Sequence, residues 1–154
     1  MEKIDRRLFL AGAGALALAP TGALAVQAPR LVMWRDPNCG CCGHWAERVQ
    51  AAFRTPVSIV PTADMAAVKE ARGVPRDLWS CHTAMIHGIV VEGHVPPADV
   101  QRLMRAPDRR IAGLAVPGMP VGAPGMDVGH SRREPFQVVA FGAGGRRAVF
   151  ASHG

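Results

Sequence analysis

The sequence predicts an α/β domain in which helices flank a mixed β-sheet. Short apolar runs of strand length alternate with segments whose apolar residues recur at helical spacing. Gly and Pro residues separate most of these segments, as they commonly do at the ends of helices and strands. Towards the carboxyl end the pattern changes to a long loop rich in Gly, Pro and Met, and a final strand pair follows it.

The first 25 residues have the layout of an export signal. Lys3, Arg6 and Arg7 give a positive start, an apolar run over 8–19 follows, and small residues at 23–25 form a cleavage site. The paired arginines also fit a twin-arginine signal. Because the apolar run is shorter than the roughly 20 residues that span a bilayer, we do not expect a membrane anchor. The prediction is a signal peptide over 1–25 and a single periplasmic domain over 26–154.

The charge of the chain is basic, with 18 Lys and Arg against 12 Asp and Glu and a formal net charge of +6. A basic chain can bind nucleic acid. Here the arginines are scattered, tyrosine is absent from the sequence, and export would separate the chain from nucleic acid. We therefore interpret the charge as a contribution to solubility and predict no nucleic-acid partner.

The first half of the domain predicts two strands that alternate with two helices. Residues 31–35 form an apolar run typical of a buried strand. A helix is expected over 43–55, because apolar side chains recur at a spacing of four: Trp45, Val49 and Phe53. A second strand over 57–60 precedes a second helix over 64–72, which Asp64 can cap.

A hairpin and a third helix complete this pattern. Strands are expected over 83–87 and 89–92 with a tight turn at Gly88, and prolines at 96 and 97 open a helix that runs to Met104. A strand-helix-strand start followed by a hairpin and a helix is the minimal thioredoxin-like arrangement. The sequence therefore predicts a thioredoxin-like mixed sheet with flanking helices.

The carboxyl-terminal part adds a loop and a hairpin. Residues 113–130 are rich in Gly, Pro and Met, and no regular element is expected there. A loop of this length in a small domain is usually functional or disordered. Residues 136–141 and 146–151 then predict a β-hairpin across a Gly-rich turn.

The cysteines carry the chemistry of this sequence. Cys39, Cys41 and Cys42 fall in one turn, between a predicted strand and a predicted helix, where the helix N-terminus stabilises thiolate. Cys39 and Cys42 alone have the spacing of a redox C-x-x-C pair, but Cys41 adds a thiol that can trap the wrong disulfide. Cys81 directly precedes the strand that faces this turn in a thioredoxin-like fold, so all four sulfurs are expected to converge.

Such a crowded set of thiolates favours Cu(I), whose sulfur ligands can bridge several ions, over a single tetrahedral zinc. Further ligands are available in soft methionine sulfurs of the loop and in two histidines near the same sheet end: Met119, Met126, His82 and His94. The methionines are also well suited to simple loop packing. Two copper-free interpretations stay open, namely thiol-disulfide exchange by Cys39 and Cys42 and purely structural disulfides.

Four stretches of the sequence, 36–45, 80–84, 91–96 and 113–120, resemble the exported CopG copper-resistance family. The resemblance implies a thioredoxin-like fold, a periplasmic location and copper bound by cysteine thiolates in a multinuclear cluster. It also implies a role in copper detoxification that involves interconversion of Cu(I) and Cu(II), alongside other periplasmic copper-handling proteins. Carried over by position, the copper ligands are Cys39, Cys41, Cys42 and Cys81. The sequence does not separate copper storage from copper oxidoreductase activity.

Overall fold

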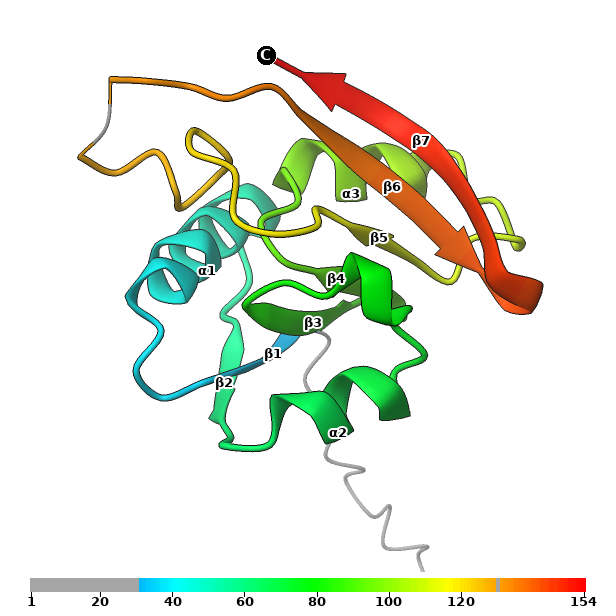
Figure 1. Cartoon of the computed structure of the whole chain (residues 1–154), viewed down its shortest axis with the longest axis horizontal. Helices are drawn as coiled ribbons and strands as arrows, with labels where there is room; N and C mark the ends of the chain where they lie inside the picture. Colours follow the sequence, from blue (N-terminus) through cyan, green and yellow to red (C-terminus); the bar gives the residue numbers. More distant parts are fainter. Residues whose placement is uncertain (1–30, 130) are drawn as a thin grey trace, which may run out of the picture.

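The protein is an α/β domain built on one mixed sheet, shown in Figure 1 as a computed structural model that describes residues 31–129 and 131–154. The sheet has seven strands in the order β2-β1-β3-β4-β5-β6-β7. The predicted mixed sheet with flanking helices is confirmed. The predicted signal peptide lies outside the described residues. The strands are β1 (Leu31–Arg35), β2 (Ser58–Pro61), β3 (His82–Ile86), β4 (Ile89–Glu92), β5 (Gly113–Ala115), β6 (Phe136–Gly142) and β7 (Arg146–His153).

In the described part of the chain, three α-helices and two short 3-10 helices connect these strands. They are α1 (Gly40–Phe53), α2 (Met65–Ala71), η1 (Arg76–Leu78), α3 (Pro97–Arg105) and η2 (Ala143–Gly145). In the part of the chain from residue 31 onward that the structure describes, no helix combines the length and apolar character needed to cross a bilayer.

Helix α1 begins at Gly40, three residues before the start that the sequence predicted. Apolar periodicity becomes visible only at Trp45, so it could not reveal the first turn. A local turn places the helix start, because the Asp36 side chain accepts a hydrogen bond from the Asn38 N–H and the Asp36 carbonyl accepts one from the Cys39 N–H. Cys39 is the N-cap of the helix. The cysteine turn is therefore the start of α1 itself.

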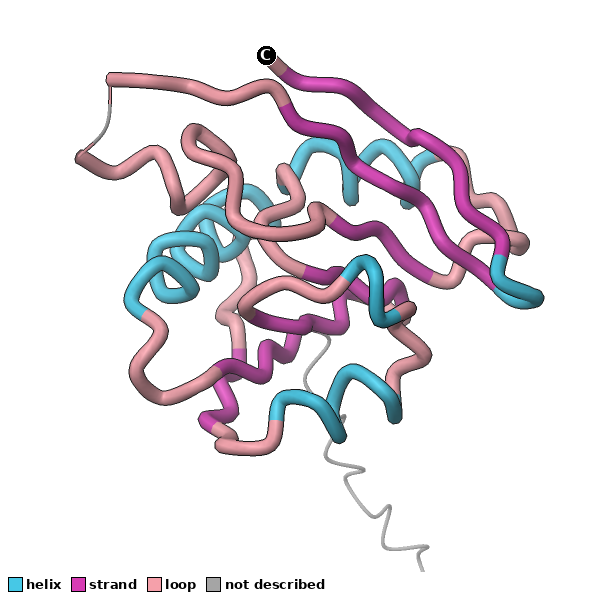
Figure 2. Tube along the Cα trace, in the orientation of Figure 1, coloured by secondary structure: helices cyan, strands magenta, loops and turns pink. Residues whose placement is uncertain are grey.

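Strand β5 lies inside the segment 113–130 that was predicted to contain no regular element. It pairs in parallel with β4 and antiparallel with β6, so it joins the predicted fold to the carboxyl-terminal hairpin. A strand of three residues is too short to show a period of two, and its partners on both sides fix it. Residues 116–129 form a loop that runs past α1 (Figure 2).

Two apolar layers form on opposite faces of the sheet. On one face α1 and α3 pack together over strand residues such as Met33, Ile86 and Val91. On the other face Leu78 of η1 packs with Val90 and Phe141. Helix α2 contacts β1 and β3, and Figure 1 shows it across the sheet from α1. The site described next lies where the first layer meets the β3 end of the sheet.

Candidate metal centre

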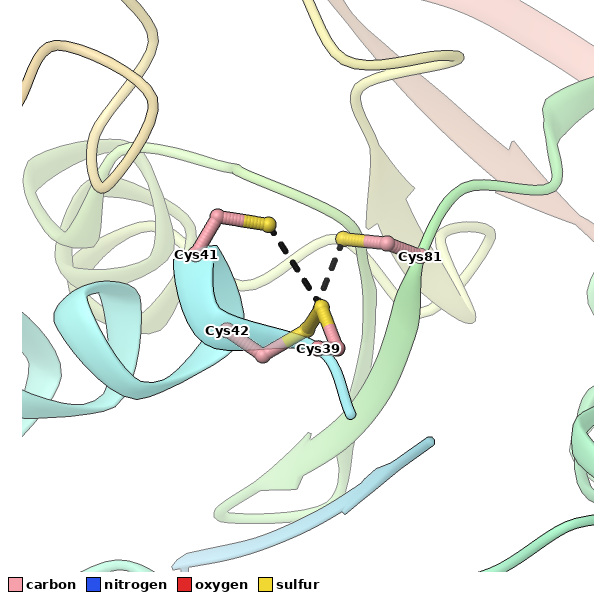
Figure 3. Close-up of side chains that lie close together, drawn as sticks. All are labelled: Cys39, Cys41, Cys42 and Cys81. Carbon is pink, nitrogen blue, oxygen red and sulfur yellow. Dashed lines mark hydrogen bonds between the residues drawn. A yellow bond between two sulfur atoms is a disulfide. The ribbon is translucent and has the colours of Figure 1, made fainter. Parts of the chain in front are cut away.

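The four cysteines converge at one end of the sheet, as the sequence predicted. Cys39, Cys41 and Cys42 come from the start of α1, and Cys81 reaches them from the residue before β3 (Figure 3). Their Sγ atoms all lie within 4.8 Å of one another. The Sγ of Cys42 is 3.7 Å from that of Cys81, and the Sγ of Cys39 is 3.4 Å from that of Cys41.

A disulfide joins Cys39 and Cys42, and Cys41 and Cys81 are free thiols. The paired residues are the two with redox C-x-x-C spacing. The structure therefore describes the oxidised state of this pair, in which two of the four sulfurs are not free to act as thiolate ligands.

The two ends of the cluster differ in their electrostatics. Cys41 and Cys42 lie in the first turn of α1, at the positive end of the helix dipole. At Cys81, burial and the nearby Cys41 thiol raise the pKa to about 12. Cys81 is thus a protonated thiol at neutral pH in the absence of a metal. Binding of a metal ion by its sulfur would release that proton.

Two buried histidines flank Cys81. The Nδ1 of His82 lies 3.2 Å from the Cys81 Sγ, and the Nε2 of His94 lies 3.1 Å from it. Both side chains are fully buried. Burial lowers the pKa of His94 and lowers that of His82 well below its ordinary value, so both rings are neutral at pH 7. Neutral imidazole is the form that ligates metal ions.

The loop after β5 covers this end of the sheet. Gly125 packs so closely on α1 that a Cβ atom there would lie 2.8 Å from the backbone nitrogen of Trp45. Met126 and Cys41 line one shallow cavity of about 300 Å³. Met119, the other candidate methionine, is 54% exposed. Met126 thus lies beside the cysteine turn, and Met119 lies largely in solvent.

A buried ion pair beneath Cys81 was not anticipated from the sequence. The Nζ of Lys69 lies 2.5 Å from a Glu92 carboxylate oxygen, and both side chains are almost fully buried. Glu92 also accepts hydrogen bonds from the Ser80 N–H and the Thr83 hydroxyl, which flank Cys81 in the chain. The one available signal was an acidic residue at the end of an otherwise apolar strand, Ile89–Glu92.

Soft and borderline donors therefore dominate the site. Within residues 31–129 and 131–154, two groups of donors meet the spacing of a metal site: the four cysteines, and Cys81 with His82 and His94. Two sulfurs that share one ion, each at about 2.3 Å from it, lie roughly 3.8–4.6 Å apart. The Cys39–Cys41 and Cys42–Cys81 distances lie just below that range, whereas Cys39 and Cys42 reach it only after their disulfide is reduced. Sulfur and imidazole ligands suit copper and zinc rather than magnesium or calcium.

Comparison with known proteins places the chain in a family. Residues 78–126, which include Cys81 and both histidines, match a family model described as a protein of unknown function, DUF411. No curated protein sequence matches the chain. Two solved structures, described as forms 2 and 1 of the copper resistance protein CopG, are each 44% identical to the chain and cover 80% of it. The match covers 97% and 95% of those structures, with TM-scores of 0.74 and 0.73. On this identity and coverage, the chain belongs to the CopG family of copper resistance proteins.

Proposed function

We propose that the protein is a periplasmic copper-resistance protein that binds Cu(I) through four cysteine thiolates. The observation that carries the proposal is the convergence of the four sulfurs within 4.8 Å at one end of the sheet. Thiolates are the preferred ligands of Cu(I), and a sulfur can bridge two ions. Four thiolates this close would therefore hold more than one copper ion. The copper resistance described for the two similar structures supports the same assignment.

Reduction of the Cys39–Cys42 disulfide is a condition of this proposal. In the oxidised state only Cys41 and Cys81 offer thiols, and two ligands are too few for a multinuclear cluster. Reduction supplies the two missing thiolates at the N-terminus of α1, where backbone N–H groups favour their charge. The copper capacity of the cysteine cluster should therefore depend on the redox state of one disulfide.

An anaerobic titration of the reduced protein with Cu(I), followed by metal analysis, tests the proposal. We expect more than one copper ion per chain and a lower capacity in a Cys81→Ser variant. The thermal midpoint of the metal-free variant, compared with that of the parent protein, serves as the control for folding. A stoichiometry at or below one, or an unchanged capacity in Cys81→Ser, would contradict the cluster.

A second candidate function is thiol-disulfide exchange, and the Cys39–Cys42 disulfide favours it. In this case the reduced pair would attack a protein disulfide and would return to the oxidised state seen here. The assay is reduction of a disulfide-bonded protein substrate by the reduced, copper-free chain, at one substrate disulfide per chain. If the substrate disulfide is not reduced and copper protects the thiols, thiol-disulfide exchange is excluded and copper binding is supported.

The same disulfide also allows a copper oxidoreductase. Two thiols of the reduced protein would each give one electron to a Cu(II) ion, form the Cys39–Cys42 bond and release two protons, which leaves two Cu(I) ions. Stopped-flow mixing of reduced protein with Cu(II) tests this step. Formation of two Cu(I) ions per disulfide supports it, and binding of Cu(II) without loss of thiols contradicts it.

A further inference from the structure

Several segments of the chain meet at the end of the sheet opposite the cysteines. Strand β3 begins beside Cys81, so the start of β4 at Ile89 and the start of β5 at Gly113 both lie at this far end. Figure 1 shows the loop after α3 and the turn between β6 and β7 together on that side, at the right of the sheet. The far end is therefore built from elements that are distant in the sequence.

Four exposed arginines belong to this end and have no partner within residues 31–129 and 131–154. They are Arg54, Arg105, Arg109 and Arg146. Every other arginine of the described residues makes a side-chain hydrogen bond, an ion pair or a contact with an aromatic ring. A guanidinium group is charged at neutral pH and offers five N–H donors. These four arginines, which we name the arginine end, therefore leave charge and hydrogen-bond donors available to an external anion.

Two cavities connect the arginines of the loop and the turn. Arg109 borders a mostly apolar cavity of about 310 Å³, and Arg146 borders a second cavity of about 300 Å³. Asp108 lines both cavities, so the two arginines lie on neighbouring parts of one surface. The carboxylate of Asp108 is already occupied by an ion pair with Arg110, which leaves Arg109 and Arg146 uncompensated.

The ends of two helices supply the other two arginines. Arg105 is the last residue of α3, and its neighbour Met104 is 37% exposed and lines the first cavity. Arg54 is the C-cap of α1, and the ring of Phe53 beside it lies 6.1 Å from that of His87 in the same cavity. The four arginines thus come from four segments that lie around an apolar hollow, and they do not line one deep groove.

We propose that the arginine end binds the surface of a membrane that contains anionic phospholipids. The phosphate groups of such lipids supply the negative charge and the hydrogen-bond acceptors that unpaired guanidinium groups can use. A bilayer presents these groups over a broad surface, and its lipids move laterally, so arginines from four segments can all find partners. An acidic protein would instead need carboxylates placed opposite each segment. The exposed side chain of Met104 suits the boundary between headgroups and acyl chains.

This orientation would leave the cysteine cluster facing away from the membrane, because the two lie at opposite ends of the sheet. The contact would be peripheral, since it uses surface charge and one apolar side chain. The proposal goes beyond the copper function and does not depend on it, because it involves no residue of the cysteine cluster.

Co-sedimentation of the copper-free protein with lipid vesicles tests the proposal. One set of vesicles contains phosphatidylglycerol mixed with phosphatidylcholine, and the other contains phosphatidylcholine alone. We expect binding to the anionic vesicles at low salt, weaker binding as salt screens the charges, and much less binding to the neutral vesicles. Absence of binding to the anionic vesicles, or equal binding to both sets, would overturn the proposal.

A pair of substitutions locates the binding surface. Each arginine near an anionic surface contributes about fivefold to the partition constant, so Arg109→Gln combined with Arg146→Gln should weaken binding by about 25-fold. Arg132→Gln combined with Arg133→Gln is the matched control, because it removes the same charge from two exposed arginines of the loop before β6. An equal loss in the control pair would mean that net charge alone attracts the protein, and would contradict the arginine end.

A readout on the unsubstituted protein reports the orientation. Vesicles that carry a spin-labelled headgroup should broaden the backbone NMR signals of residues 104–110 and 143–147 more than those of residues 39–45, and the reverse order would contradict the proposal. The Cu(I) capacity of the Arg109→Gln, Arg146→Gln protein should equal that of the parent protein. Loss of vesicle binding would therefore refute the membrane contact alone, and failure of the Cu(I) titration would refute the cysteine cluster alone.

Discussion

The Gly125→Ala substitution should lift the loop after β5 from helix α1. Gly125 has a φ of +88°. An added Cβ would lie 2.8 Å from the backbone nitrogen of Trp45 and 3.0 Å from the carbonyl oxygen of Cys41. Both contacts are helix backbone, which cannot rotate away. The left-handed conformation of a non-glycine residue costs about 1–2 kcal/mol. Overpacking against a fixed neighbour costs a further 1–3 kcal/mol or so, which gives a total of about 2–5 kcal/mol.

Gly129→Ala is the matched control for this prediction. Gly129 lies in the same loop with a φ of +77°, but nothing stands within 4 Å of its Cβ position. This variant should therefore lose only the conformational part, about 1–2 kcal/mol. Urea unfolding measures the free energy of unfolding of both variants. We expect Gly129→Ala to be the more stable by about 1–3 kcal/mol. Equal stability of the two variants would refute the packing of the loop on α1.

The same substitution should also open the site. Pro124, whose carbonyl oxygen accepts the His94 hydrogen bond, directly precedes Gly125. Displacement of the loop would remove this acceptor and expose the partly buried Cys81 thiol. Alkylation of Cys81 in the oxidised protein should thus be faster in Gly125→Ala than in the parent protein or in Gly129→Ala. An unchanged rate in Gly125→Ala would mean that the loop does not shield the thiol.

Three other perturbations have defined outcomes. Lys69→Met leaves the Glu92 carboxylate buried without its cation, so urea unfolding should show a loss of about 3–5 kcal/mol, and a loss below 1 kcal/mol would contradict the pair. Asp64→Ala removes the N-cap hydrogen bond of α2 and should cost about 1 kcal/mol in the same measurement. The hydrogen bonds from Arg147 lower the pKa of Asp77. An NMR titration should therefore find an Asp77 pKa below its ordinary value, and Arg147→Ala should raise that pKa. The stability from this pair is present at neutral pH and should decline as the pH falls through the Asp77 pKa.

The main path of the fold could be predicted from the sequence because its signals are local. The strand at 31–35, the hairpin at Gly88 and the Pro-initiated helix α3 each depend on residues within one short segment. Strand β5 could not be predicted in this way, since three residues acquire strand structure only through pairing with β4 and β6. The start of α1 was missed for a related reason, because a polar turn rather than an apolar period defines it.

In the candidate site, too, only some features could be predicted from the sequence. Convergence of Cys81 with the cysteine turn followed from the element order, and the structure places the four sulfurs together. The order of elements cannot reveal which side chains meet across the sheet. Lys69 and Glu92 are 23 positions apart in the chain, and only the packing of α2 against the sheet makes them partners. The hydrogen bond between His94 and Pro124 likewise depends on the path of an irregular loop.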